Sequence, residues 1–126
     1  MDKVTVFRPR ERVRQDGEAI AALYRNLGTA TAEQLVTRAL GELALTMSGL
    51  AAQVRAHDLA DLARQLRRLQ RMAENLGMIS LGLVSGDART CLESGDSTAF
   101  SAVWARLMRI AERSLAADKG VADLSV

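Results

Sequence analysis

The chain has 126 residues, of which 48% are hydrophobic, 25% charged and 3% aromatic, and its formal net charge is +2. A chain of this length forms a single domain with its own core, and so small a net charge does not indicate a polyanionic partner. Because Cys91 and His57 are the only residues of their kinds, an internal disulfide, a zinc site built on paired cysteines and a two-histidine metal site are excluded. We expect no metal and no cofactor.

Membrane and nucleic-acid partners are not expected either. No apolar run approaches the roughly 18 residues that a membrane-spanning helix needs. The first residues carry charge where a secretory signal would have an apolar stretch. The few aromatic residues cannot build a stacking platform for single-stranded nucleic acid. We therefore expect a cytoplasmic protein that binds neither nucleic acid nor a membrane.

Residues 1–15 are predicted to form an N-terminal arm, residues 16–118 the helical body and residues 119–126 a C-terminal tail. Pro9 disfavours a helix at the residue before it, and the arm carries a basic cluster made of Arg8, Arg10, Arg12 and Arg14. Beyond the arm only helical periodicity is present, and the abundance of Ala and Leu favours helices throughout.

Gly28 separates the first two predicted helices. The first spans about 17–27, and Gly28 is placed to end it as a C-terminal glycine. The second is expected to begin at Thr31, where Thr-Ala-Glu-Gln fits a capping box, and to end near Ala56. Apolar residues at intervals of three and four form its core stripe, which is Val36, Ala39, Leu40, Leu43, Met47, Leu50 and Val54.

Three more helices are expected after His57. Asp58 is predicted to cap the third, which ends before Gly77; the fourth spans about 79–93; the fifth spans about 97–117 after a turn at Gly95. The inward residues are Leu59, Leu62, Leu66, Leu69, Ala73 and Leu76 in the third, and Phe100, Val103, Leu107, Ile110, Ala111 and Leu115 in the fifth. Short connections make sequential helices antiparallel, so we expect an all-α up-down antiparallel four-helix bundle with an additional N-terminal helix.

The second helix has an unusual outer face. Opposite its core stripe lie small and apolar residues, namely Gly41, Ala44, Leu45, Ser48 and Ala52. A helix face of this kind is normally covered. Either the first helix folds across it, or a partner or a second copy of the chain does.

Three pairs of residues resemble landmarks of a known family. Asp58-Leu59 opens the third helix, Leu76-Gly77 closes it and Gly95-Asp96 introduces the fifth. In this order and spacing, the stretch from about Thr31 to Leu115 resembles the histidine-containing phosphotransfer (HPt) domain. Members of that family carry a phosphorylated His in a His-x-Leu-Lys-Gly motif on the corresponding helix.

The resemblance places Arg67 at the position of the phosphorylated His. Leu69 keeps the Leu of the motif, whereas Gln70 stands at the Lys position and Arg71 at the Gly position. Phosphotransfer needs a neutral imidazole nitrogen as nucleophile, and a guanidinium stays protonated and offers no lone pair. The resemblance therefore implies an HPt-like scaffold without the HPt reaction, and hence a protein that is not an enzyme.

A partner-binding face is implied on the third helix. At about 100° per residue, Arg64, Arg67 and Arg71 share a face beside the leucine stripe. The implied partner is a response-regulator receiver domain, whose aspartate pocket could accept charge-assisted hydrogen bonds from an arginine, or a histidine kinase. The implied contact residues are Arg64, Arg67, Gln70, Arg71, Ala44 and Leu45. The alternative is an ordinary solvated row of arginines.

Two other functions stay open. An active phosphotransfer protein would use His57, although Ala60-Asp61 stands at the Lys-Gly positions of the motif and an adjacent carboxylate would repel a phosphoryl group. An unrelated helical adaptor or dimerisation module would share only its bundle geometry with the family. A homodimer is one form that such a module would take. Cys91 and Trp104 are interpreted as packing residues, with Trp104 as a partner-contact anchor in the alternative.

Overall fold

The computed structural model describes the backbone of residues 13–124 and the side chains of residues 13–116. This part of the chain contains five helices and no strand. The helices are α1 (Glu18–Leu27), α2 (Thr29–Arg55), α3 (Leu62–Asn75), α4 (Ile79–Glu93) and α5 (Ser97–Leu124). The predicted all-α class is confirmed.

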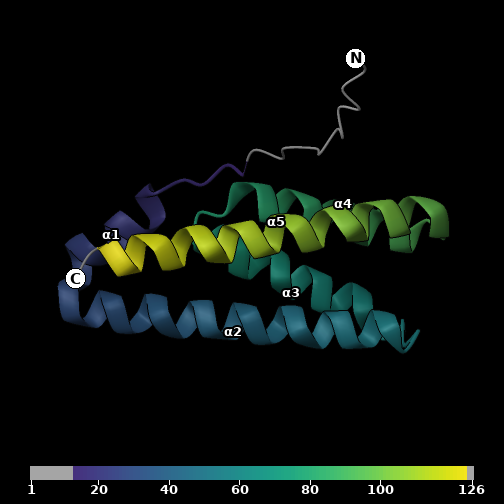
Figure 1. The fold of residues 1–126 in the computed structure, drawn as a ribbon, viewed down its shortest axis with the longest axis horizontal. Coiled ribbons are helices and arrows are strands. Elements are labelled where there is room, and N and C mark those ends of the chain that lie inside the picture. Colours follow the sequence, from purple (N-terminus) through teal and green to yellow (C-terminus); the bar gives the residue numbers. More distant parts are fainter. Residues whose placement is uncertain (1–12, 125–126) are drawn as a thin grey trace, which may run out of the picture.

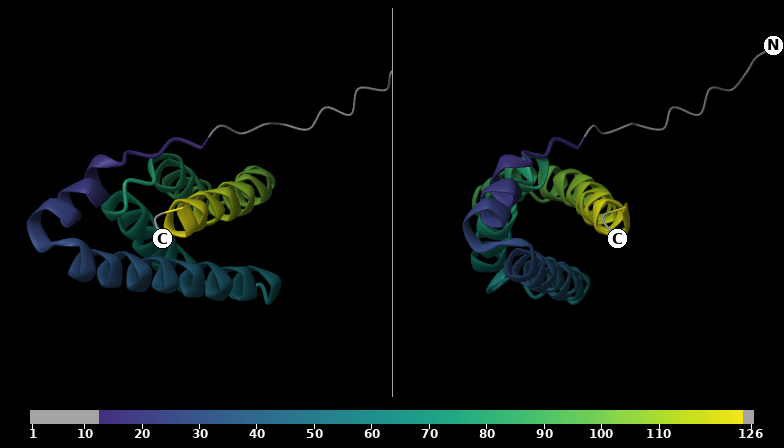
Figure 2. Two further views of the ribbon diagram at one scale, coloured as in Figure 1. Left: turned by 60° about the vertical axis from the view of Figure 1, so that its left-hand side comes forward. Right: turned by 90° about the vertical axis from the view of Figure 1, so that its left-hand side faces the viewer.

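The helices from α2 to α5 form a curved layer. Successive helices run in opposite directions along the long axis of the molecule (Figure 1), and each packs against the next one in the chain. α2 and α5 make only a marginal contact, so the end view resembles an open C (Figure 2). α1 packs against α2. The closed four-helix bundle therefore stays a prediction.

The core lies on the concave side of this layer and is built from the leucine stripes. α3 and α4 are its central elements, because α3 is packed between α2 and α4, and α4 between α3 and α5. Burial of one leucine side chain stabilises the fold by about 1.5–3 kcal/mol. Burial of the leucine stripes therefore explains why each helix packs against the next one in the chain. The most deeply buried large residues are Leu43, Leu50, Leu62, Leu66, Leu69, Met78, Leu81, Leu107 and Ile110.

Gly28 joins α1 directly to α2. With φ of 80°, it donates its N–H to the Tyr24 carbonyl and accepts the Ala32 N–H, both at 3.0 Å. α2 therefore begins at Thr29, two residues before the predicted start, and the capping box expected at Thr31 is wrong. The reason is that one glycine in this conformation reverses the chain and serves both helix ends.

The turn from α2 to α3 also differs from the prediction. His57 adopts a left-handed φ of 53°, and the Asp58 N–H is donated to the Gln53 carbonyl at 2.9 Å. These residues close α2 in a Schellman motif, so Asp58 does not cap α3. The helix starts at Leu62 instead, and Leu59, predicted to face inward, is 48% exposed.

α3 and α4 end in the same motif as α2, but with glycine at the left-handed position. The Met78 N–H bonds the Ala73 carbonyl at 2.8 Å around Gly77, and the Asp96 N–H bonds the Cys91 carbonyl at 3.2 Å around Gly95. Both glycines have φ of 71°. His57 is therefore a non-glycine residue in a conformation that favours glycine.

The described part of the arm docks on the turn between α3 and α4. The Arg14 N–H bonds Ser80 Oγ at 2.7 Å, the Ser80 N–H bonds the Arg14 carbonyl at 3.2 Å, and the Asp16 N–H bonds the Gly77 carbonyl at 2.6 Å. Gln15 reaches the Ser114 carbonyl on α5 at 3.4 Å. Arg8, Arg10 and Arg12 lie outside the described residues.

The last helix is longer than predicted. Asp96 caps it by accepting the Ala99 N–H at 3.0 Å, as the turn at Gly95 suggested. α5 then continues to Leu124, whereas the periodicity predicted an end near Ala117.

Candidate functional site

The outer face of α3 carries four exposed arginines. Leu62, Leu66, Leu69 and Ala73 point into the core, which turns Arg64, Arg67, Arg68 and Arg71 to solvent. We call these four residues the arginine face. The predicted exposure of Arg67 near the middle of the helix is confirmed.

Only one member of the arginine face is held by a carboxylate among residues 13–116. Arg64 Nε lies 2.8 Å from Asp61 Oδ1. A hydrogen bond from Gln65, and then the one from Arg64, lower the pKa of the Asp61 carboxyl from its ordinary value. Arg67, Arg68 and Arg71 make no hydrogen bond or ion pair with a described residue. Three guanidiniums are thus available to an acidic partner.

Gln70 is placed differently from the arginines. It is half-buried on the side of α3 that packs against α4, and its amide donates to Glu74 at 3.2 Å. A Cβ at Gly86 would lie 3.4 Å from Gln70 Nε2, so the helices approach closely at this glycine. Gln70 therefore fills the α3–α4 contact beside the arginine face.

The outer face of α2 is uncovered by any described residue. Gly41, Ala44, Ser48 and Ala52 are exposed, and Leu45 is 74% exposed. A Cβ at Gly41 would meet no atom within 4 Å. α1 packs on α2 without covering this face, so the expectation that the first helix folds across it is wrong.

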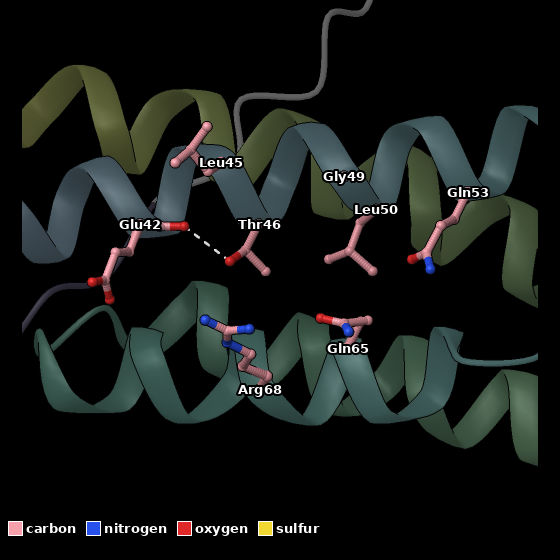
Figure 3. A pocket seen from close by; sticks show the side chains of 8 residues that line it. All are labelled: Glu42, Leu45, Thr46, Gly49, Leu50, Gln53, Gln65 and Arg68. Atoms are coloured by element: carbon pink, nitrogen blue, oxygen red, sulfur yellow. Dashed lines mark hydrogen bonds between the residues drawn. The ribbon is translucent and has the colours of Figure 1, made fainter.

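A groove of about 480 Å³ runs between α2 and α3. Leu50 forms its floor, Arg68 rises from α3, and Leu45 stands on the rim and extends away from α3 (Figure 3). The groove thus joins the arginine face of α3 to the uncovered face of α2. The full lining is Glu42, Leu45, Thr46, Gly49, Leu50, Gln53, Gln65 and Arg68.

Of the residues that line this groove, only Leu45 was predicted from the sequence as a contact residue. Arg68, Gly49, Gln53 and Gln65 were not predicted. A signal for the α2 wall was present: positions 42, 45, 46, 49 and 53 repeat at three- and four-residue intervals along the flank of the core stripe. Which helix would pack beside that flank depends on tertiary structure. No local pattern therefore pointed to Gln65 as the opposite wall.

Other chemistry-bearing residues do not form a site. His57 is exposed at the end of α2, and Cys91 is half-buried on α4. Trp104 is half-buried and stacks on Phe100 with ring centroids 6.1 Å apart, which confirms its packing role. Within the described residues, no group of His, Cys, Asp or Glu could hold a metal ion.

Comparison with known proteins found no relative of this chain. No protein-family model, curated protein or solved structure matches the chain. Within the described residues, every helix is too short or too polar to cross a membrane.

Proposed function

We propose that this chain is a non-catalytic, HPt-like protein that binds a receiver domain or a histidine kinase and modulates phosphorelay signalling. Its fold would be the up-down antiparallel four-helix bundle of that family, with α1 added at the N-terminus. The observation that supports the proposal is the exposed guanidinium of Arg67, which lies near the middle of α3 without a described partner.

The chemistry of Arg67 favours binding without phosphoryl transfer. A guanidinium has no lone pair for attack on a phosphoaspartate. It can donate two parallel hydrogen bonds to a carboxylate or a phosphoryl group. A hydrogen bond to a charged group contributes about 1.5–3 kcal/mol, so one such contact changes the affinity for a receiver domain measurably.

The surroundings of Arg67 supply the rest of a docking surface. Arg64 and Arg71 extend the positive charge along the same face of α3. Ala44 and Leu45 are exposed on the neighbouring α2 and offer an apolar contact. Charges at such a surface mainly steer and orient a partner, and the apolar contact adds the buried area.

The test is incubation with phosphorylated receiver domains, followed by measurement of both label and affinity. We expect no stable phosphoryl label on this chain, and binding that weakens about tenfold or more in Arg67→Gln. Arg25→Gln, on α1 and away from the arginine face, is the matched control. Acid-labile label that disappears in His57→Ala would instead establish an active phosphotransfer protein. Unchanged binding by Arg67→Gln would remove Arg67 from the site.

A helical adaptor or dimerisation module is the second candidate, and the uncovered face of α2 favours it. Sedimentation of the chain alone distinguishes it. A tight homodimer that Ser48→Glu dissociates would support this candidate, because a charge on that face would be buried in the dimer. A monomer at all concentrations would contradict self-association.

A further inference from the structure

The groove between α2 and α3 is long enough to receive side chains from several turns of a partner helix. From Glu42 to Gln53 it follows α2 for about 16 Å, or three helical turns, at the usual rise per residue. Leu50 forms an apolar floor, and a Cβ at Gly49 would meet no atom within 4 Å. A partner backbone can therefore approach the wall of the groove closely at this glycine.

The charges around the groove favour an acidic occupant. Arg68 lines it without a described carboxylate partner, and Arg64 and Arg71 lie one turn away on the same helix. The carboxylate on the opposite wall, Glu42, is engaged by Arg38 at 3.7 Å. Arginines presented in this way donate charge-assisted hydrogen bonds to carboxylates.

The same features disfavour two other occupants. A second copy seated in the groove would bring its own arginine face toward this one, and like charges brought together at an interface oppose binding. A nucleic acid would bring its phosphates against a groove whose lining holds one cation, Arg68, beside the carboxylate of Glu42 and the exposed Leu45. A protein segment with both apolar and acidic side chains satisfies both parts of the surface.

We propose that the groove between α2 and α3 binds an acidic amphipathic helix of a partner protein. Its apolar side chains, spaced i, i+3 and i+7, lie over Leu50 and Gly49 and against the rim at Leu45. Its acidic flank faces Arg68 and the neighbouring arginines. This goes beyond the proposed function, because it requires neither a receiver domain nor Arg67, which does not line the groove.

The test is fluorescence anisotropy with the full chain and two dye-labelled helical peptides of about 18 residues, long enough to hold a helix. Both carry leucines at i, i+3 and i+7; one has glutamates along the flank and the other has lysines. We expect the glutamate peptide to bind about tenfold more tightly or better. Equal affinities, or no binding of the glutamate peptide at about 1 mM, would overturn the proposal.

Matched variants locate the binding. Gly49→Leu fills the groove and should weaken binding of the glutamate peptide about tenfold, whereas Gly41→Leu, also exposed on α2 but outside the groove, should leave it unchanged. Arg68→Gln should weaken it and Arg25→Gln should not. If Gly49→Leu binds the glutamate peptide as well as the parent chain does, the groove is not the site. The same conclusion follows if an added DNA duplex displaces the peptide equally well from Gly49→Leu and from Gly41→Leu.

These outcomes are separable from those of the proposed function. Loss of receiver binding in Arg67→Gln with unchanged peptide binding leaves the groove proposal intact. Loss of peptide binding in Gly49→Leu in a chain that binds no receiver domain leaves the groove proposal intact as well.

Discussion

Replacing Gly77 by alanine should push Asp16 away from the turn between α3 and α4. Gly77 has φ of 71°, which costs an alanine about 1–2 kcal/mol. An added Cβ would also overlap the Asp16 carbonyl oxygen and lie 3.0 Å from its carbon. That backbone atom cannot swing aside like a side-chain tip, so the segment must move.

Moving it breaks the bond from the Asp16 N–H to the Gly77 carbonyl, measured at 2.6 Å. A backbone hydrogen bond contributes about 0.5–1.5 kcal/mol. The free energy of unfolding should therefore fall by about 1.5–3.5 kcal/mol in Gly77→Ala, the sum of the conformational cost and the lost bond.

Gly95→Ala is the matched control. Gly95 has the same φ of 71° and closes α4 with the same motif, but a Cβ there would meet no atom within 4 Å. Urea denaturation followed by far-UV circular dichroism should show a loss of about 1–2 kcal/mol for this variant. If both variants lose the same stability, the contact with Asp16 carries no energy and the reasoning fails.

Three other predictions concern single side chains. His57→Gly should raise the free energy of unfolding by about 1 kcal/mol, because glycine adopts the left-handed φ of 53° without strain; no gain by urea denaturation would contradict this. The NMR titration midpoint of Asp61 should lie below the ordinary aspartate value and rise in Gln65→Ala. Because the folded pKa is lowered, this carboxylate stabilises the fold above the unfolded pKa, and the contribution is lost as the pH falls through the folded value. Ser114→Ala should leave stability unchanged or raise it by up to about 1 kcal/mol, since the buried Ser114 hydroxyl has no hydrogen-bond partner among the described residues; a clear loss in thermal unfolding would show that it has one.

The helices and their inward faces could be predicted from the sequence because the leucine spacing is regular. Leu62, Leu66 and Leu69 repeat at three and four residues, and all three are buried as expected. Leu59 continues the same interval backward, yet it is exposed. The spacing gave no sign that the end of α2 takes up Asp58 and delays the start of α3, since that depends on His57 adopting a conformation that its residue type rarely adopts.

The candidate site could be predicted only in part, for a related reason. Arg67 and Leu45 stand out in the sequence because each interrupts a pattern, one as a cation at the phospho-His position of the resemblance and the other as a leucine on an outer face. Gln53 and Gln65 interrupt nothing, and they meet only because α2 lies beside α3. A groove between two helices is a property of their packing, which no single helix encodes.

The net charge of +2 conceals a strongly positive surface on α3. Among the residues of the arginine face, from 64 to 71, there is no carboxylate, and Asp61 and Glu74 lie just beyond its ends.

The arginine face and the apolar part of the groove at Gly49 and Leu50 should therefore respond differently to salt. Raising the ionic strength from about 50 mM to 500 mM screens exposed charges, so it should weaken a contact made by Arg67 or Arg68 and leave the apolar contact at Gly49 and Leu50 in place. If the groove binds its helix as we propose, the tenfold effect of Gly49→Leu persists in high salt while the preference for glutamate over lysine disappears. If the effect of Gly49→Leu vanishes in high salt together with the preference for the glutamate peptide, the arginines alone make the interaction.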